Sequence, residues 1–296
     1  MTHDVEKDSL SGTETTGHEW DGIKELNTPL PRWWLYTFYA TILFALGYCL
    51  FYPAVPLPWG GHTEGLLKTS NRKQLEADIE ANAVSTRPQF ISIAARDLDA
   101  IQADPKLRDF AIAGGRAAFA QNCAPCHGGS GQGAKGYPNL LDDVWLWGGS
   151  LDQIHQTIRF GVRNANPESR QGAAMPAWGD AAKNPPQLLA SAQISAVADY
   201  VLSLNHKDVD VASAKVGEAV FADNCAACHG ENAAGNPEMG APPLTTGVWL
   251  YGGDKATLVE TIAHGRAGQM PAWSERLDES TVKMLALYVH QLGGGK

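Results

Sequence analysis

The stretch Cys123-Ala-Pro-Cys126-His127 decides how this chain folds, and a second copy, Cys225-Ala-Ala-Cys228-His229, follows 102 residues later. Cys-x-x-Cys-His is the spacing at which two thiols bond covalently to the vinyl groups of one haem, while the adjacent His reaches the iron from the same side. The two copies therefore predict two covalently bound haem c groups. The four cysteines are the expected attachment points, and His127 and His229 are the expected proximal axial ligands.

Both motifs lie inside a longer internal repeat. The matching stretches are Gly115–Cys123 with Gly217–Cys225, Val144-Trp-Leu-Trp-Gly-Gly149 with Val248-Trp-Leu-Tyr-Gly-Gly253, and Met175-Pro-Ala-Trp178 with Met270-Pro-Ala-Trp273. Each unit closes with an amphipathic helical pattern, over residues 192–204 and 279–292. Similarity of this length predicts two domains of one fold in tandem.

A rigid electron-transfer haem needs a second axial ligand, and a methionine thioether or another imidazole is the usual choice. Of the five methionines, Met175 and Met270 stand in equivalent Met-Pro-Ala-Trp motifs. Met1 begins the chain, Met284 lies on an apolar helix face, and Met239 has no counterpart in the first unit. Met175 and Met270 are therefore the candidate distal ligands, with gap-filling core residues as the alternative. Sequence order alone favours ligation within each unit.

Weaker hypotheses concern residues around each haem. A carbonyl 11 or 13 residues after the ligand histidine could accept its Nδ1–H and fix the ring: the candidates are Pro138 and Pro242. Indole and guanidinium groups could pair with the haem carboxylates, with core packing as the alternative for the indoles: the candidates are Trp145, Trp249, Arg159, Arg163 and Arg266.

Two glycines occur at equivalent positions, each four residues before a phenylalanine. Gly115 and Gly217 would let the first helix of each unit cross the last helix of the same unit closely. Tyr200 and Tyr288 are the expected aromatic partners in these crossings.

Residues 33–52 form a run of 20 residues without a charge, WWLYTFYATILFALGYCLFY. A helix rises about 1.5 Å per residue, so the run can cross a hydrocarbon core of about 30 Å. Aromatic residues crowd both ends, and Pro53 stops the helix, whereas no signal-peptidase site follows. The run predicts an uncleaved single-span anchor, with a buried core helix as the alternative.

The flanks of this span carry no clear topological signal. Positive charges occur on both sides of the span, so they do not decide its orientation. Since haem is attached to this motif outside the bacterial cytoplasmic membrane, we expect a cytoplasmic N-terminus and periplasmic haem domains. Residues 1–32 read as a flexible polar tail. After the span, Thr69 or Ser70 could cap a short polar helix that ends near Asn82 in a connector.

Composition excludes several classes of protein. The formal charge is −9 and the isoelectric point is about 5.4, which argues against nucleic acid as a partner. Of the five cysteines, four belong to the two motifs and Cys49 lies in the apolar run, so a disulfide framework is disfavoured. A zinc or redox dithiol site would not need a histidine directly after each pair.

The repeat resembles class I c-type cytochrome domains in Gly-x-x-x-Phe, Cys-x-x-Cys-His, Pro-x-Leu, a Trp-containing turn, a distal Met and a final helix. The block Asp21-Gly-Ile-Lys-Glu-Leu-Asn-Thr-Pro-Leu-Pro-Arg-Trp-Trp34 resembles the start of the dihaem subunit III of cbb3-type cytochrome c oxidases. The resemblance implies an all-α chain with one transmembrane helix and two tandem class I cytochrome c domains. The expected layout is tail 1–32, transmembrane helix 33–52, connector 53–104, and domains 105–204 and 205–296.

The resemblance also implies a role in aerobic respiration. Such a subunit takes electrons from a donor cytochrome c or a quinol-oxidising complex. It passes them, through a monohaem cytochrome subunit, to the haem–copper catalytic subunit of a proton-pumping oxidase, and reduces no oxygen itself. Family members also suggest that Met270 serves the haem at Cys123 and Cys126, and Met175 the haem at Cys225 and Cys228. The competing hypotheses are an anchored carrier for a periplasmic dehydrogenase or a nitrogen-oxide reductase, and a dihaem peroxidase.

Overall fold

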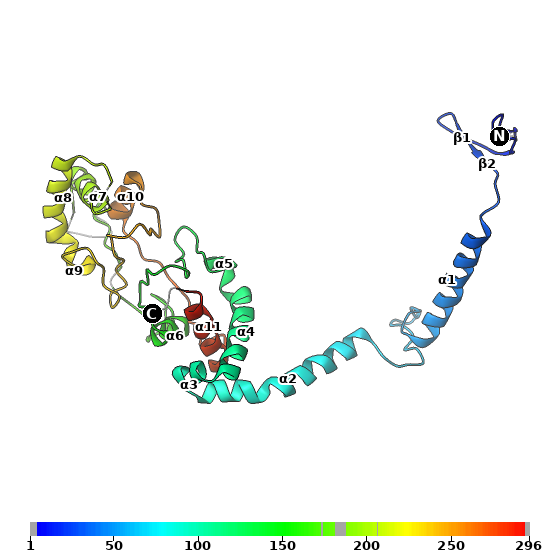
Figure 1. Cartoon of the computed structure of the whole chain (residues 1–296), viewed down its shortest axis with the longest axis horizontal. Helices are drawn as coiled ribbons and strands as arrows, with labels where there is room; N and C mark the ends of the chain where they lie inside the picture. The colour runs from blue at the N-terminus through cyan, green and yellow to red at the C-terminus, as the bar shows by residue number, and fades with distance from the viewer. Residues whose placement is uncertain (1–4, 173, 181–187, 206, 294–296) are drawn as a thin grey trace. The chain divides into compact units, whose positions relative to one another are not determined.

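The computed structural model describes residues 5–172, 174–180, 188–205 and 207–293. It divides into two compact units, residues 1–85 and 86–296. Apart from one short hairpin, the regular structure of the described residues is helical, as the sequence predicts (Figure 1).

The first unit begins with an antiparallel pair, β1 (Thr15–Trp20) and β2 (Ile23–Leu26). Their two-residue turn, Asp21-Gly22, has positive φ at both positions, 48° and 87°. This is the turn geometry whose twist suits a hairpin, and Asp-Gly favours it. The prediction of a flexible tail over residues 1–32 is therefore wrong for this stretch, because the turn residues outweigh the polar composition.

Helix α1 (Arg32–Phe51) is the one helix in the described residues that is long and apolar enough to cross a membrane. Its mean hydropathy reaches 1.5 and none of it is buried within the protein. An apolar helix exposed along its whole length would be costly in water, whereas lipid would cover it. The alternative of a buried core helix is therefore disfavoured.

Helix α2 (Asn71–Ala95) is longer than the short helix predicted to end near Asn82. Ser70 accepts a hydrogen bond from the Lys73 amide, so the start of the helix follows the prediction. Its last turns belong to the second unit, where Ile93 is fully buried. The connector therefore contributes to a hydrophobic core and is more than a spacer.

The second unit contains the remaining helices. They are α3 (Leu98–Ala103), α4 (Pro105–Asn122), α5 (Ala124–His127), α6 (Leu151–Phe160), α7 (Ser191–Ser203), α8 (Val211–Asn224), α9 (Ala226–His229), α10 (Lys255–His264) and α11 (Glu279–Gln291). Side chains that accept hydrogen bonds from first-turn amides begin α4, α6, α8, α10 and α11, from Asp104, Ser150, Asp210, Asp254 and Asp278 respectively.

These helices build two hydrophobic cores, and neither core follows the order of the sequence repeat. The first core combines α3, α4 and α6 with the last helix of the chain, α11. The second core combines α7, which ends the first repeat, with α8 and α10 from the second repeat. Figure 1 shows α11 beside α4 and α6, and α7 beside α8 and α10. Each core thus takes its closing helix from the other repeat.

The glycine crossings follow this exchange. A Cβ on Gly115 would lie 2.1 Å from the carbonyl oxygen of Met284 in α11, and a Cβ on Gly217 would lie 2.0 Å from that of Ala196 in α7. Both contacts involve backbone, so only glycine permits them. Close crossings therefore occur as predicted, but the predicted partner within the same repeat is wrong: Tyr288 packs on Phe119 and Tyr200 on Phe221, with ring centroids 5.4 and 5.2 Å apart.

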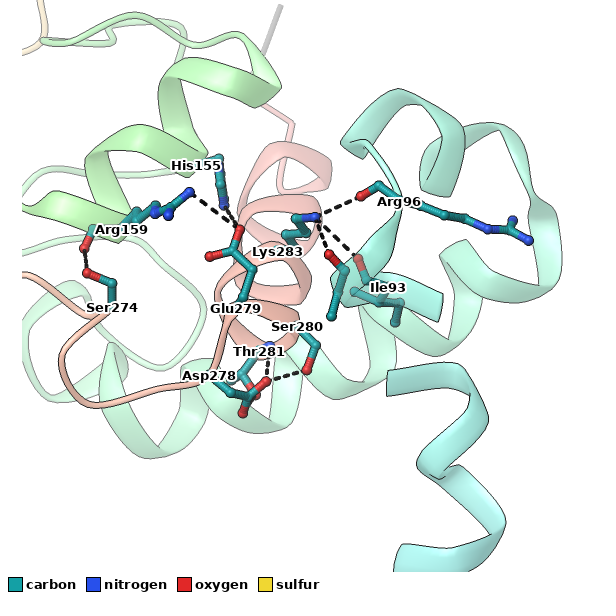
Figure 2. A network of polar contacts seen from close by, with 11 residues as sticks. Ile93, Arg96, His155, Arg159, Ser274, Asp278, Glu279, Ser280, Thr281 and Lys283 are labelled. Carbon is teal, nitrogen blue, oxygen red and sulfur yellow. Dashed lines mark hydrogen bonds and ion pairs between the residues drawn. The ribbon is translucent and has the colours of Figure 1, made fainter. Parts of the chain in front are cut away.

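Polar contacts of α11 attach the end of α2 to the first core (Figure 2). The Lys283 ammonium donates to the carbonyl oxygens of Ala94 and Arg96, at 2.9 and 2.7 Å. These carbonyls lie at or just past the C-terminus of α2, where a positive charge is stabilising. The carboxylate of Glu279, also in α11, lies 3.3 Å from Nε2 of His155 and 3.6 Å from Nη1 of Arg159, and both of these residues belong to α6.

Candidate functional site

The two Cys-x-x-Cys-His motifs adopt the same local structure. In each, the first cysteine ends a long helix, α4 or α8, and the rest forms the single helical turn α5 or α9. The amide of each histidine donates to the carbonyl of its first cysteine, at 2.9 Å for His127 and 3.0 Å for His229. One turn of helix thereby presents both thiols and the imidazole together.

Each histidine ring is fixed by a proline carbonyl. Nδ1 of His127 lies 3.0 Å from the carbonyl oxygen of Pro138, and Nδ1 of His229 lies 3.0 Å from that of Pro242. A carbonyl only accepts hydrogen bonds, so Nδ1 carries the proton and Nε2 keeps its lone pair for a metal. Burial lowers the pKa of both histidines and so favours the neutral imidazole that metal binding requires.

The first cysteine of each pair is half-buried. Burial, and secondarily the neighbouring cysteine, raises the pKa of Cys123 and of Cys225 to about 11. Redox dithiols depend on an attacking thiol whose pKa is lowered by its surroundings. The raised pKa of the first cysteine therefore argues against a redox dithiol.

Each candidate distal methionine packs in the core whose other helices come mainly from the other repeat. Met270 packs against the first core together with Cys123, and Met175 packs against the second core together with Cys225. Met270 exchanges two backbone hydrogen bonds with Val162, at 2.9 and 3.0 Å, and the amide of Met175 donates to the carbonyl of Arg266 at 2.9 Å. The structure therefore places each methionine against the hydrophobic core on which the first cysteine of the other repeat's motif packs.

Glycines make these pairings possible. Gly161 and Gly265 end α6 and α10 with φ of +72° and +69°. A Cβ at either position would lie within 2.4 Å of a methionine carbonyl oxygen, that of Met270 for Gly161 and that of Met175 for Gly265. The backbone of each methionine loop thus passes directly over the other repeat's glycine.

The indole and guanidinium groups that could pair with the haem carboxylates lie in different surroundings. Trp145 packs against the first core and Trp249 against the second. Arg159 faces Glu279, and Arg266 contacts Glu260 at 3.2 Å and the ring of Tyr251 at 4.3 Å.

Sequence reasoning missed two glycines that position the histidine loops. Gly133 and Gly235 each lie six residues after a ligand histidine, and their amides donate to the histidine carbonyls at 2.7 and 2.8 Å. Both have positive φ, +72° and +83°. The repeated spacing in the two units was the signal that could have identified them.

Comparisons with known proteins agree with this geometry. Residues 12–58 match the family model "N-terminal domain of cytochrome oxidase-cbb3, FixP", residues 112–205 match "Cytochrome c", and residues 212–289 match "Cytochrome C oxidase, cbb3-type, subunit III". The prediction of two cytochrome c domains behind an N-terminal apolar helix is confirmed.

Full-length relatives extend the match. The chain is 53% identical to "Cbb3-type cytochrome c oxidase subunit CcoP" of Azospirillum brasilense, over 98% of this chain and 99% of the relative. It is 51% identical to the FixP subunit of Bradyrhizobium sp. (strain ORS 278), over 100% of both chains. It is 48% identical to the CcoP subunit of Cereibacter sphaeroides, over 95% of both.

The histidine loop generates a first prediction. A Cβ at Gly133 would lie 2.6 Å from the carbonyl oxygen of Tyr137 and 2.8 Å from the carbonyl carbon of Pro138. Gly133→Ala should therefore push the Pro138 carbonyl away from His127, lower the free energy of unfolding by about 1–3 kcal/mol, and shift the reduction potential of one haem only. A redox titration and thermal unfolding of the purified protein measure both effects.

The matched control is Gly129→Ala, two residues after the same histidine. Gly129 has no positive φ and no atom within 4 Å of an added Cβ. Potentials and stability should stay unchanged in this variant. Equal behaviour of the two variants would contradict the role assigned to the loop.

Proposed function

Since the chain belongs to the family of cbb3-type cytochrome c oxidase subunit III, we propose a specific route for its electrons. The protein is an electron-transfer subunit of the oxidase and carries covalently bound haem c. Its partners are other subunits of that complex. In our proposal, electrons arrive from a donor cytochrome c or a quinol-oxidising complex and leave through a monohaem subunit to the haem–copper subunit. No step of oxygen reduction falls to this chain.

We assign the first haem to Cys123 and Cys126, with His127 as proximal ligand. The observation that carries the assignment is the hydrogen bond between His127 Nδ1 and Pro138, which leaves Nε2 free for iron. The residues thus fit the group: two thiols and one oriented, neutral imidazole on a single helical turn. Bound there, the haem supplies an iron that alternates between the ferrous and ferric states. Cys225, Cys228 and His229 repeat the arrangement with Pro242.

We propose that the distal ligands are exchanged, Met270 serving the first haem and Met175 the second. The shared cores support this pairing, because Met270 packs with Cys123 and Met175 with Cys225. The short backbone pairings with Val162 and Arg266 hold both loops rigidly, which an electron carrier needs if oxidation and reduction are to cause little rearrangement.

The side chains that could pair with the haem carboxylates fall into two groups. Arg159 and Arg266 already contact Glu279 and Glu260, which favours a role in tying elements together over pairing with haem carboxylates. Trp145 and Trp249 stay candidates for an indole hydrogen bond to a haem carboxylate, since each packs beside its own motif's core.

We further propose that α1 anchors the protein in the bacterial inner membrane with the N-terminus in the cytoplasm and the haem domains in the periplasm. The fully exposed apolar surface of α1 supports a membrane span. The side is inferred from the compartment in which this haem motif is loaded.

The orientation predicts a protease pattern. Protease added to intact spheroplasts should digest the chain beyond residue 52 and leave an N-terminal epitope tag protected. Lysed spheroplasts should lose the tag as well, which serves as the control. Immunoblotting reads both, and loss of the tag in intact spheroplasts would reverse the orientation.

The proposed role in an oxidase predicts which proteins should purify together with this chain. Gentle solubilisation of membranes and purification through a tag on this chain should yield a haem–copper subunit and a monohaem cytochrome in equal amounts, identified by mass spectrometry. The complex should oxidise a reduced donor cytochrome c with oxygen. Recovery of the chain with a dehydrogenase or a nitrogen-oxide reductase, and without a haem–copper subunit, would favour the anchored-carrier alternative.

The exchange of methionines predicts a crossed effect in chains that keep one haem. With Cys225 and Cys228 replaced by alanine, only the first haem is attached. Adding Met270→Ala should then change that haem from low spin to high spin, whereas Met175→Ala should leave it low spin. Visible and electron paramagnetic resonance spectra measure the spin state. Ligation within each repeat predicts the opposite pattern, so either result assigns the ligands.

A further inference from the structure

One pair of aromatic residues takes no part in the haem sites proposed above. Trp147 and Tyr251 stand at the same position of the repeated Val-Trp-Leu-Trp/Tyr-Gly-Gly stretch. Trp147 is only 9% exposed although it lies in a loop, and Tyr251 is half-buried. Large loop side chains become buried when another part of the chain covers them, so what covers these two rings is informative.

Trp147, from the first repeat, packs on a loop of the second repeat. A Cβ added to Gly240 would lie 2.2 Å from Cζ2 of Trp147, so the indole lies directly on the backbone of this glycine. Gly240 precedes Pro242 by two residues, and the Pro242 carbonyl holds His229. Trp147 thus touches the loop that orients the proximal ligand of the second site.

Tyr251 makes the reciprocal contact. A Cβ on Gly136 would lie 3.4 Å from Cε1 of Tyr251, and the amide of Gly136 donates to the carbonyl of Leu250 at 2.8 Å. Gly136 precedes Pro138 by two residues, and the Pro138 carbonyl holds His127. Each repeat therefore places one aromatic ring on the other repeat's histidine-positioning loop.

Arg163 links the two contacts. Its guanidinium lies 5.3 Å from the centroid of Trp147, within the range of a cation–π interaction. Its Nη1 donates at 3.1 Å to the carbonyl of Gly268, and an added Cβ on Gly268 would lie 3.4 Å from the hydroxyl of Tyr251. Arg163 has a φ of +46°, a conformation that costs energy for a residue other than glycine or asparagine.

The exchange of methionines keeps the two sites near one another. Arg266 pairs with Met175 in the second core, and Met270 pairs with Val162 in the first. Only four residue steps join Arg266 to Met270, so their Cα atoms lie within about 14 Å of each other. Because so short a segment crosses from one core to the other, the two cores lie close together at this point. The rings of Trp147 and Tyr251 occupy part of the space between them.

We propose that Trp147, Tyr251 and Arg163 are positioning residues that hold the two haem sites in one relative arrangement and thereby set the rate of electron transfer between them. The proposal rests on the proposed function, since it takes both motifs to carry haem. Transfer requires only that one electron leave one iron and reduce the other, with no bond made or broken. The rings act by fixing the loops; they are not oxidised themselves.

The test uses the full-length protein with both haems attached, in variants that remove or exchange the rings. Trp147→Ala and Tyr251→Ala remove them. Trp147→Tyr and Tyr251→Trp give each repeat the residue of the other and keep an aromatic ring in place. Tyr137→Ala is the control, because this side chain is 46% exposed in the same loop as Gly136.

Two measurements separate positioning from general damage. The rate of electron transfer between the haems is measured after fast photoreduction, and hydrogen exchange is measured for the amides of residues 133–137 and 238–241. The alanine variants should slow transfer several-fold, because electron tunnelling weakens steeply as the distance between the haems grows and loosened loops let that distance vary. Tyr251→Ala should also speed exchange of the Gly136 amide, and Trp147→Ala that of the Gly240 amide. The exchanged-ring variants and Tyr137→Ala should keep the transfer rate of the unaltered protein.

Arg163→Asn tests the link if the alanine variants do not fold. Asparagine accepts a positive φ, so this change removes the guanidinium without backbone strain. It should slow transfer while both haems stay attached and low spin. Unchanged transfer rates in this variant and in the alanine variants, with two haems bound, would overturn the positioning role alone. A protein that attaches fewer than two haems by its pyridine haemochrome spectrum before any substitution would instead overturn the proposed function.

Discussion

The structure depends on the backbone pairing that carries each methionine loop into the other core. Met270 pairs with Val162 and Met175 with Arg266, and glycines at 161 and 265 allow the carbonyls to pass without a side chain between them. The helix that follows each methionine packs in the same core as that methionine: α11 follows Met270 in the first core, and α7 follows Met175 in the second.

The exchange explains why a repeat of two similar sequences behaves as one body. In two separate domains, linker motion would vary the distance between the haems. Here, each hydrophobic core contains helices from both repeats, so separating the repeats would expose Phe119 and Phe221, which are 1% and 2% exposed. Large buried side chains of this kind are worth about 3–5 kcal/mol each when truncated. A fixed arrangement suits a subunit whose task is to pass electrons in one direction.

Much of this was predictable from the sequence. The haem motifs, the apolar span and the proline carbonyls depend on local spacing, and the structure places the carbonyls 3.0 Å from the histidines, as the spacing suggested. The hairpin was also predictable, because Asp21-Gly22 is a strong turn signal even within a polar tail. Only the family resemblance suggested an exchange between the repeats; the aromatic contacts could not, since Tyr288 on Phe119 and Tyr200 on Phe221 are the same contact chemically. Identical partners carry no information about which copy pairs with which.

Connection lengths do carry that information. Only residues 204–210 separate α7 from α8, and helices joined by a short connection usually pack as antiparallel neighbours. That packing leaves α4 without a closing helix from its own repeat, so α11 must supply it. The short connection between α7 and α8, rather than the similarity of the motifs, therefore indicates which closing helix joins which core.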